Sequence, residues 1–67
     1  MSNTPKFEIF RDVQGYYRWR LVAGNGEKVA ASEAYVRHEG AKRSVARIKE
    51  IAPSAVVVDL TVVRLGY

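Results

Sequence analysis

One segment, Gly15–Ser32 (GYYRWRLVAGNGEKVAAS), constrains the fold more than any other part of the chain. Two runs rich in strand-forming residues, Tyr16–Ala23 and Lys28–Ser32, flank Gly24-Asn25-Gly26-Glu27. Asn-Gly supplies the positive φ angles that a tight turn needs, so the segment predicts a β-hairpin. Alternation in the first run gives an apolar and a basic face. The apolar face carries Tyr17, Trp19 and Leu21, and the basic face carries Tyr16, Arg18, Arg20 and Val22.

A further strand is predicted ahead of the hairpin, at Lys6–Arg11, where Phe7 and Ile9 alternate with Glu8 and Phe10. In the turn that follows, Asp12 favours the start and Gly15 the close. The three strands then form an antiparallel meander. Its expected core face consists of Phe7, Ile9, Tyr17, Trp19, Leu21, Val29 and Ala31.

Helical spacing replaces strand alternation from about His38. Apolar residues then recur at i, i+4, i+7 and i+11, as Ala41, Val45, Ile48 and Ala52. Pro53 ends the helix, because the residue before a proline avoids helical backbone angles. At 1.5 Å per residue this helix is ~21 Å long, enough to lie across one face of a small sheet.

The last segment, Ala55–Leu65 (AVVVDLTVVRL), has five valines and neither glycine nor proline, so it predicts one strand or two strands bent near Asp59. A strand that is apolar on both faces must be covered on both. The valines could complete the core of their own chain, or they could pair with a second copy. We favour the second copy, because the strand is long for so small a sheet and an open apolar edge invites pairing. The expected interface residues are Val56, Val57, Val58, Leu60, Val62 and Val63.

The length also favours an assembly. With 67 residues the chain has room for one domain, expected at 6–67 after a disordered leader at 1–5. A domain of this size buries only about 60% of the surface that its unfolded chain exposes. The chain has no cysteine and a single histidine, which excludes disulfides and thiolate metal sites. Oligomerisation is the remaining common source of stability, and we expect no cofactor.

Composition is that of a globular domain, with 48% hydrophobic and 27% charged residues. No apolar run approaches the roughly 20 residues of a membrane span. The first residues, MSNTPK, lack the apolar core of a signal peptide. We therefore expect a cytoplasmic protein without a membrane partner. The net charge of +4 permits an anionic partner without requiring one.

No pattern in the sequence points to catalysis. His38 stands between Arg37 and Glu39 without an orienting partner, which is typical of a solvated surface histidine. The carboxylates are scattered through turns and helix ends, with no spacing that would hold a metal ion. Gly24-Asn25-Gly26 is not a phosphate-binding loop, since no helix follows it. Trp19 and Tyr35 could line a pocket, but large aromatics on an apolar strand face more often belong to the core.

Nucleic-acid binding is the alternative to a protein-interaction role. The segment Arg37–Glu50 holds five Lys or Arg against two Glu, and the second face of the sheet places aromatics among cations. Stacking on aromatics with phosphate contacts alongside is how single strands are gripped. The candidate contacts are Arg18, Arg20, Arg37, Lys42, Arg43 and Arg47. We do not favour this interpretation, because so small a chain reaches a high isoelectric point with few charges.

Several motifs together resemble one family. Phe7-Glu8-Ile9-Phe10, Gly15–Leu21, Asn25-Gly26-Glu27, Ser32-Glu33-Ala34-Tyr35 and Asp59-Leu60-Thr61 resemble the YegP-like small domains of unknown function. The resemblance implies a β3-α-β unit present either as two tandem copies or as one copy that dimerises by exchanging C-terminal strands. For this single copy it implies a strand-exchanged homodimer with one antiparallel sheet, and it supplies no catalytic residues. We therefore expect an α+β, non-catalytic interaction module.

Overall fold

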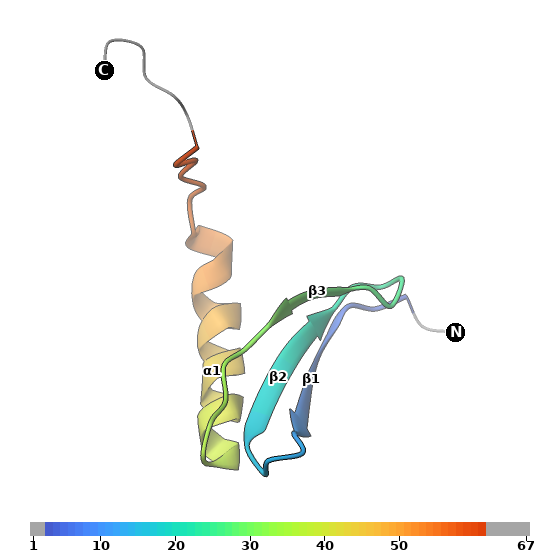
Figure 1. Ribbon diagram of the computed structural model, residues 1–67. Coiled ribbons are helices and arrows are strands. Elements are labelled where there is room, and N and C mark those ends of the chain that lie inside the picture. The colour runs from blue at the N-terminus through green and yellow to red at the C-terminus, as the bar shows by residue number, and fades with distance from the viewer. Residues whose placement is uncertain (1–2, 62–67) are drawn as a thin grey trace.

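The computed structural model describes residues 3–61, which form a three-stranded antiparallel sheet with one helix against one face (Figure 1). The strands are β1 (Lys6–Arg11), β2 (Tyr17–Val22) and β3 (Lys28–Ala31), side by side in the order β1-β2-β3. The helix α1 spans His38–Ile51, and a 3-10 turn, η1 (Ala52–Ser54), follows it. The predicted α+β class and meander are confirmed, and β1 has the predicted bounds.

The two hairpin turns share one geometry. Asp12 N donates to Tyr16 O (2.8 Å) in the first, and Ala23 N donates to Glu27 O (2.7 Å) in the second. Each pair closes a three-residue loop that ends in a left-handed glycine, with φ of 91° at Gly15 and 90° at Gly26. The prediction that Asn25 shares the positive φ is wrong, since no described residue other than glycine has one. Its side chain instead accepts a hydrogen bond from Glu27 N (3.0 Å).

The core is small, and it differs from the sequence prediction in the burial of Val22 and in the exposure of Val29 and Ala31. Among the described residues the buried hydrophobics are Trp19, Val22 and Ala41. Val22 was expected on the wet face. It lies on that face, opposite Lys6 and beside Glu8 in one hollow, yet it is buried. The register of β2 against β3 shifts next to it, between Leu21 and Val22. Val29, the extra residue of this bulge, and Ala31 were expected in the core, but β3 is exposed along its whole length.

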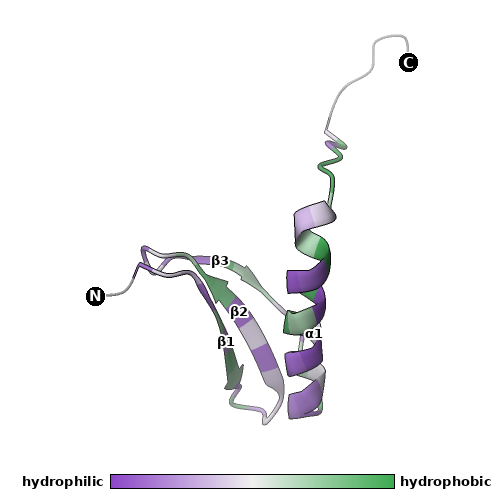
Figure 2. Ribbon diagram, turned by 180° about the vertical axis from the view of Figure 1, so that it is seen from behind, coloured by the Kyte–Doolittle hydropathy of each residue, from purple (hydrophilic) through white to green (hydrophobic). Residues whose placement is uncertain are grey.

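The helix α1 packs on β2 and β1 through its apolar face. Hydrophilic and hydrophobic residues alternate along it, as expected of a helix with one covered side (Figure 2). The predicted start near His38 and the end ahead of Pro53 are confirmed. Ala52, however, lies beyond α1 in η1 and is exposed, so the apolar stripe ends one turn earlier than expected. Within residues 3–61 no helix has the length and hydropathy to cross a membrane.

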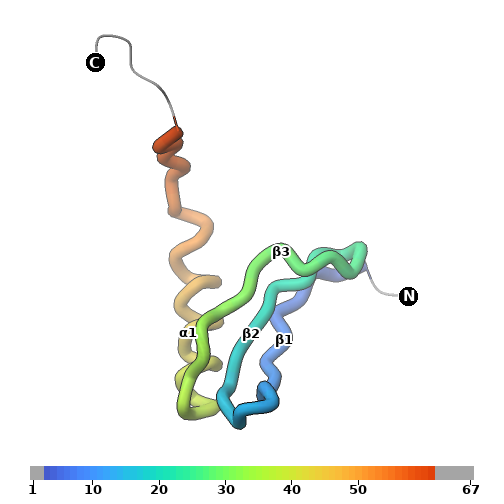
Figure 3. Tube along the Cα trace, viewed as in Figure 1, coloured from blue at the N-terminus to red at the C-terminus, as the bar shows by residue number. Residues whose placement is uncertain are grey.

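Beyond η1 the chain runs away from the sheet, as Figures 1 and 3 show. Residues 55–59 have no regular secondary structure, and Leu60 and Thr61 form a turn in which Thr61 N donates to the Asp59 carboxylate (2.9 Å). The strand predicted at 55–65 is therefore not formed by the described part of this segment in a single chain; Val62 and Val63 lie outside the described residues. The Cα radius of gyration is 15.8 Å, against about 11 Å for a compact chain of this length.

Candidate interaction surface

The segment 55–61, called the tail from here on, holds the longest run of exposed apolar side chains in the described chain. The side chains of Val56, Val57, Val58 and Leu60 are between 68% and 95% exposed. The hydrogen bond from the Thr61 side chain, followed by that from its backbone, holds the pKa of Asp59 below its ordinary value. The tail thus presents a row of aliphatic side chains that ends in a small polar turn.

An open apolar groove runs between α1 and β1. One hollow of about 450 Å³ is lined by Ile9, Lys42, Val45, Ala46 and Lys49. A second, of about 440 Å³, is lined by Pro5, Lys6, Phe7, Leu21, Val45 and Lys49. Val45 and Lys49 line both hollows, so the two form one surface, which we call the β1 groove. Its walls are aliphatic and aromatic, and lysines stand at its sides.

The helix is joined to the sheet by a polar contact that the sequence did not reveal. Trp19 Nε1 and the Tyr35 hydroxyl both donate to Ser44 Oγ, each at 2.9 Å. The Trp19 ring also packs edge-on against Phe7, with ring centroids 5.4 Å apart. Trp19 and Tyr35 therefore join the sheet to the helix. The sequence offered one indication of this role for Ser44. It lies three residues after Ala41, and this spacing places both residues on the face of α1 that packs on the sheet.

Tyr35 is held at the exit from the sheet by its backbone as well as its hydroxyl. Its N–H and C=O exchange hydrogen bonds with Tyr17, both at 2.8 Å. Its ring lies against Gly40, where an added Cβ would come within 3.2 Å of Tyr35 Cδ1. Ser32 stabilises the backbone where the chain leaves the sheet, because its hydroxyl accepts a hydrogen bond from Trp19 N (2.9 Å) and donates one to Glu33 O (2.8 Å). The contacts fix where α1 begins relative to β2.

On the opposite face of the sheet, cations are paired with carboxylates. Arg18 Nε lies 2.7 Å from the Asp12 carboxylate, and Arg20 Nε lies 2.7 Å from that of Glu8. The hydrogen bonds from these arginines are the largest cause that lowers the pKa of Asp12 and of Glu8. The Arg20 guanidinium also stands 4.6 Å from the centroid of the Phe10 ring. The aromatic and basic face expected from the sequence exists, but its charge is largely compensated.

The other predicted nucleic-acid contacts lie on or beside α1. Arg43 is within 3.9 Å of Glu39, and Arg47 within 2.9 Å of Glu50. For Arg37 and Lys42 the structure gives no ion pair within residues 3–61. The six cations are therefore not brought together, because Arg18 and Arg20 lie on the face of the sheet away from α1.

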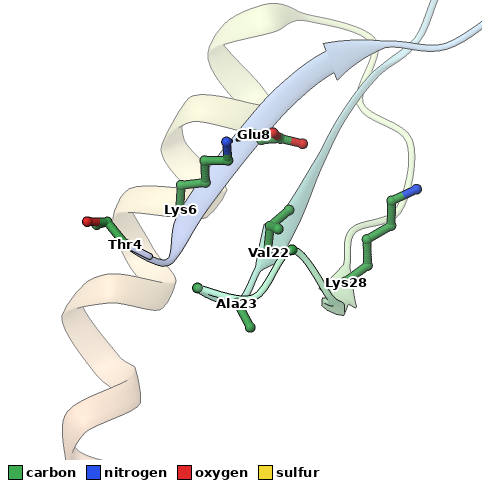
Figure 4. Close-up of a pocket in the computed structure, with 8 residues that line it drawn as sticks. Thr4, Lys6, Glu8, Val22, Ala23 and Lys28 are labelled. Atoms are coloured by element: carbon green, nitrogen blue, oxygen red, sulfur yellow. Dashed lines mark ion pairs between the residues drawn. The ribbon is translucent and has the colours of Figure 1, made fainter. Parts of the chain in front are cut away.

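A further hollow, of about 470 Å³, opens on that outer face (Figure 4). It is lined by Thr4, Lys6, Glu8, Val22, Ala23, Gly24, Gly26 and Lys28. Lys6 Nζ is 3.5 Å from the Glu8 carboxylate, so the opposite charges in this hollow partly cancel.

His38, the histidine considered for catalysis, is exposed at the other end of the sheet, with its ring centroid 5.3 Å from that of Tyr17. In the described part of the chain no group of three His, Cys, Asp or Glu is placed to hold a metal ion.

These features define a class of protein: a small α+β domain with a three-stranded meander, one covering helix and an uncovered apolar tail. The model of a domain of unknown function, DUF1508, matches residues 12–59. A UPF0339 protein of Treponema denticola is 42% identical over 55 residues, which cover 82% of this chain and 95% of the relative. The chain belongs to this family, the YegP-like small domains, and the resemblance seen in the sequence is confirmed.

A solved structure and a longer relative extend the comparison. The NMR solution structure of a protein from Haloferax volcanii matches with a TM-score of 0.75 at 39% identity, covering 82% of this chain and 93% of that one. A UPF0339 protein of Stutzerimonas stutzeri is 43% identical over 53 residues, which are 79% of this chain but 46% of the relative. The chain therefore spans about half the length of that relative.

Proposed function

We propose that the chain is a non-catalytic interaction module that acts as a homodimer, in which the two copies exchange their C-terminal strands. The observation that carries the proposal is the exposure of Val56, Val57, Val58 and Leu60, at 68% or more each. Burying one such side chain is worth about 1.5–3 kcal/mol, so a monomer that leaves four in water forgoes a large part of its stability.

The accessible surface of the chain supports the same assembly. It is 5984 Å² for a mass of 7.5 kDa. A compact monomer of that mass exposes roughly 4,200 Å². The single chain thus exposes more surface than a compact domain of its mass, as expected of a chain whose apolar tail is uncovered. With a described core of three buried hydrophobics, a second copy is the available source of further burial.

Family membership is consistent with a two-unit assembly. The Stutzerimonas stutzeri relative is about twice as long as the matched segment, which leaves room for a second unit in the same chain. A single-unit chain would reach the same arrangement by association. A cytoplasmic location remains a prediction.

Nucleic-acid binding has weaker support. Four of its six candidate cations stand within 4 Å of a carboxylate, and the six are divided between two surfaces. Phosphate contacts would have to compete with those ion pairs. We therefore retain the interaction module as the proposed function.

Gel filtration with light scattering tests the homodimer. The chain has a mass of 7.5 kDa, and we expect twice that mass from low micromolar concentration upward. A mass of one chain at every concentration would contradict the proposal.

A further inference from the structure

We infer that the hollow on the outer face of the sheet binds a small phosphorylated polyol, with the phosphate between two lysines. All the residues of this site belong to one chain, so it is independent of the proposed homodimer. Three features of the described residues point to it: the placement of the lysines, the balance of charge around them, and a wall that the N-terminal segment closes.

Two lysines lie in one row across the sheet. Lys6 on β1 is opposite Val22 on β2, and Val22 in turn is opposite Lys28 on β3. Figure 4 shows the two lysine side chains on either side of Val22. Adjacent strands are about 4.8 Å apart, so the two lysine backbones are roughly 10 Å from each other. Because a lysine carries its charge on a flexible stem, both ammonium groups can reach one anion above Val22.

The positive charge around the hollow is only partly cancelled. Lys6 Nζ is 3.5 Å from the Glu8 carboxylate, but that carboxylate also accepts a hydrogen bond of 2.7 Å from Arg20. Lys28 has no ion pair within residues 3–61. Glu27, the carboxylate of the nearby turn, does not line the hollow. The resulting excess of positive charge suits a phosphate monoester, which carries a charge of about −1.5 to −2 at pH 7.

The rest of the lining favours a phosphate that carries hydroxyl groups. The hydrogen bond from Arg20 is the largest cause that lowers the pKa of Glu8, so at neutral pH its carboxylate is an acceptor. It can accept hydrogen bonds from ligand hydroxyls, whereas it would repel a second anionic group. Val22 and Ala23 supply the apolar part of the lining. The volume of about 470 Å³ lies within the range of small-molecule sites, about 300–1,000 Å³.

One wall of the hollow is held in place by a close backbone contact. A Cβ at residue 24 would clash with the carbonyl oxygen of Asn3, so Gly24 allows the N-terminal segment to lie against the turn. This contact brings Thr4 to the edge of the hollow. At Gly26 an added Cβ would meet no described atom within 4 Å. Glycines of this kind let a ligand approach the backbone closely.

A nucleic-acid strand fits this hollow less well than a small molecule. Proteins that grip single strands have a positively charged groove that follows the backbone over several nucleotides. The two arginines on the same face, Arg18 and Arg20, are instead held by the carboxylates of Asp12 and Glu8. The row of two lysines therefore provides for one phosphate group.

A titration of the ¹⁵N-labelled full chain, followed by NMR, tests the inference. The probe is glycerol phosphate, with glycerol and inorganic phosphate as its separate parts. We expect saturable shift changes at the amides of Lys6, Val22, Gly24 and Lys28, tighter binding than that of inorganic phosphate, and no such changes with glycerol. The absence of saturable changes at millimolar glycerol phosphate, or changes spread evenly over the chain, would overturn the inference. Equal affinity for inorganic phosphate would overturn the part assigned to ligand hydroxyls.

Paired variants separate a site from general attraction between charges. Lys6→Gln combined with Lys28→Gln removes both phosphate contacts and should weaken binding at least tenfold. The matched control, Lys42→Gln with Lys49→Gln, removes the same charge from α1 and should leave binding unchanged. An equal loss in the two pairs would refute the site. Lys28→Gln alone, on the exposed strand β3, should also weaken binding, and it replaces the first pair if the spectrum shows that this pair is unfolded.

Discussion

The indole Nε1 of Trp19, on β2, donates a hydrogen bond of 2.9 Å to Ser44 Oγ, on α1. The same oxygen accepts from Tyr35, so one hydroxyl ties the strand, the exit loop and the helix together. Trp19 is buried, and this contact gives its N–H the partner that a buried indole needs.

Replacing Ser44 by alanine should therefore destabilise the fold. Both donors lose their shared acceptor, and a buried donor left unsatisfied costs about 1–3 kcal/mol. The free energy of unfolding by urea, measured at one fixed chain concentration, checks this. Ser54→Ala is the control, because Ser54 is exposed in η1, and its effect should stay within about 0.5 kcal/mol. Equal effects of the two substitutions would show that the contact is not stabilising.

The Asp12 carboxylate should make stability depend on acid pH. Its pKa is lowered from 3.8, chiefly by the hydrogen bond from Arg18, with backbone N–H groups of Tyr16 and Gln14 adding to the effect. A carboxylate whose folded pKa is depressed contributes stability above its unfolded pKa, and the contribution is lost as pH falls through the folded pKa. We therefore expect wild-type stability to decline as the pH drops below about 3.8.

Asp12→Asn isolates this contribution. The amide keeps an oxygen that can accept from the N–H groups of Gln14 and Tyr16, but it removes the charge beside Arg18. We expect a lower urea midpoint than wild type at pH 7 and a shallower decline between pH 5 and 2. Parallel pH profiles for the two proteins would mean that the Asp12–Arg18 pair does not contribute.

A charge placed on the tail should weaken the dimer. Val58→Asp would bury an unpaired carboxylate in the proposed interface, which is costly. We expect at least a tenfold rise in the dimer dissociation constant, read from light scattering over a dilution series. Val13→Asp introduces the same charge at a fully exposed position in the β1–β2 turn and should leave the constant unchanged. If both variants stayed dimeric with equal affinity, the tail would not lie in the interface.

Nucleic-acid binding can be tested with labelled single-stranded RNA at two salt concentrations. Binding that neutralises several phosphates falls steeply as salt rises. Because four of the six candidate cations are paired, we expect no such salt-dependent binding. Tight binding at low salt that is lost in Arg37→Ala with Lys42→Ala would favour the nucleic-acid function instead. Those two residues are suitable because neither has an ion pair within the described chain.

Local patterns predicted much of the fold. Alternation located β1, and Pro53 located the end of α1, because both signals depend on neighbouring residues. The burial of Val22 could not be predicted in this way, since burial depends on how distant segments pack and not on alternation along one strand. The role of Ser44 was hidden for a similar reason, because both of its donors lie far from it in the sequence or on another element.

Of the candidate surface, the sequence predicted the tail but not the β1 groove. The valine run at 56–58 predicted an apolar segment that must be buried against another surface. In the single chain these valines are exposed. The β1 groove was not visible, because Ile9 and Val45 come together only when α1 is laid on the sheet. In the proposed homodimer the tail becomes a strand only beside a second copy, and the pattern within one sequence does not say how two copies are placed.

The most direct test of strand exchange is an isotope-filtered NMR experiment on a mixture of ¹³C-labelled and unlabelled chains. It detects contacts only between a labelled copy and an unlabelled one. Our account predicts intermolecular contacts from the methyl groups of Val56 and Val58 to the sheet and helix of the other copy. Contacts of these methyl groups found solely within their own chain would contradict it.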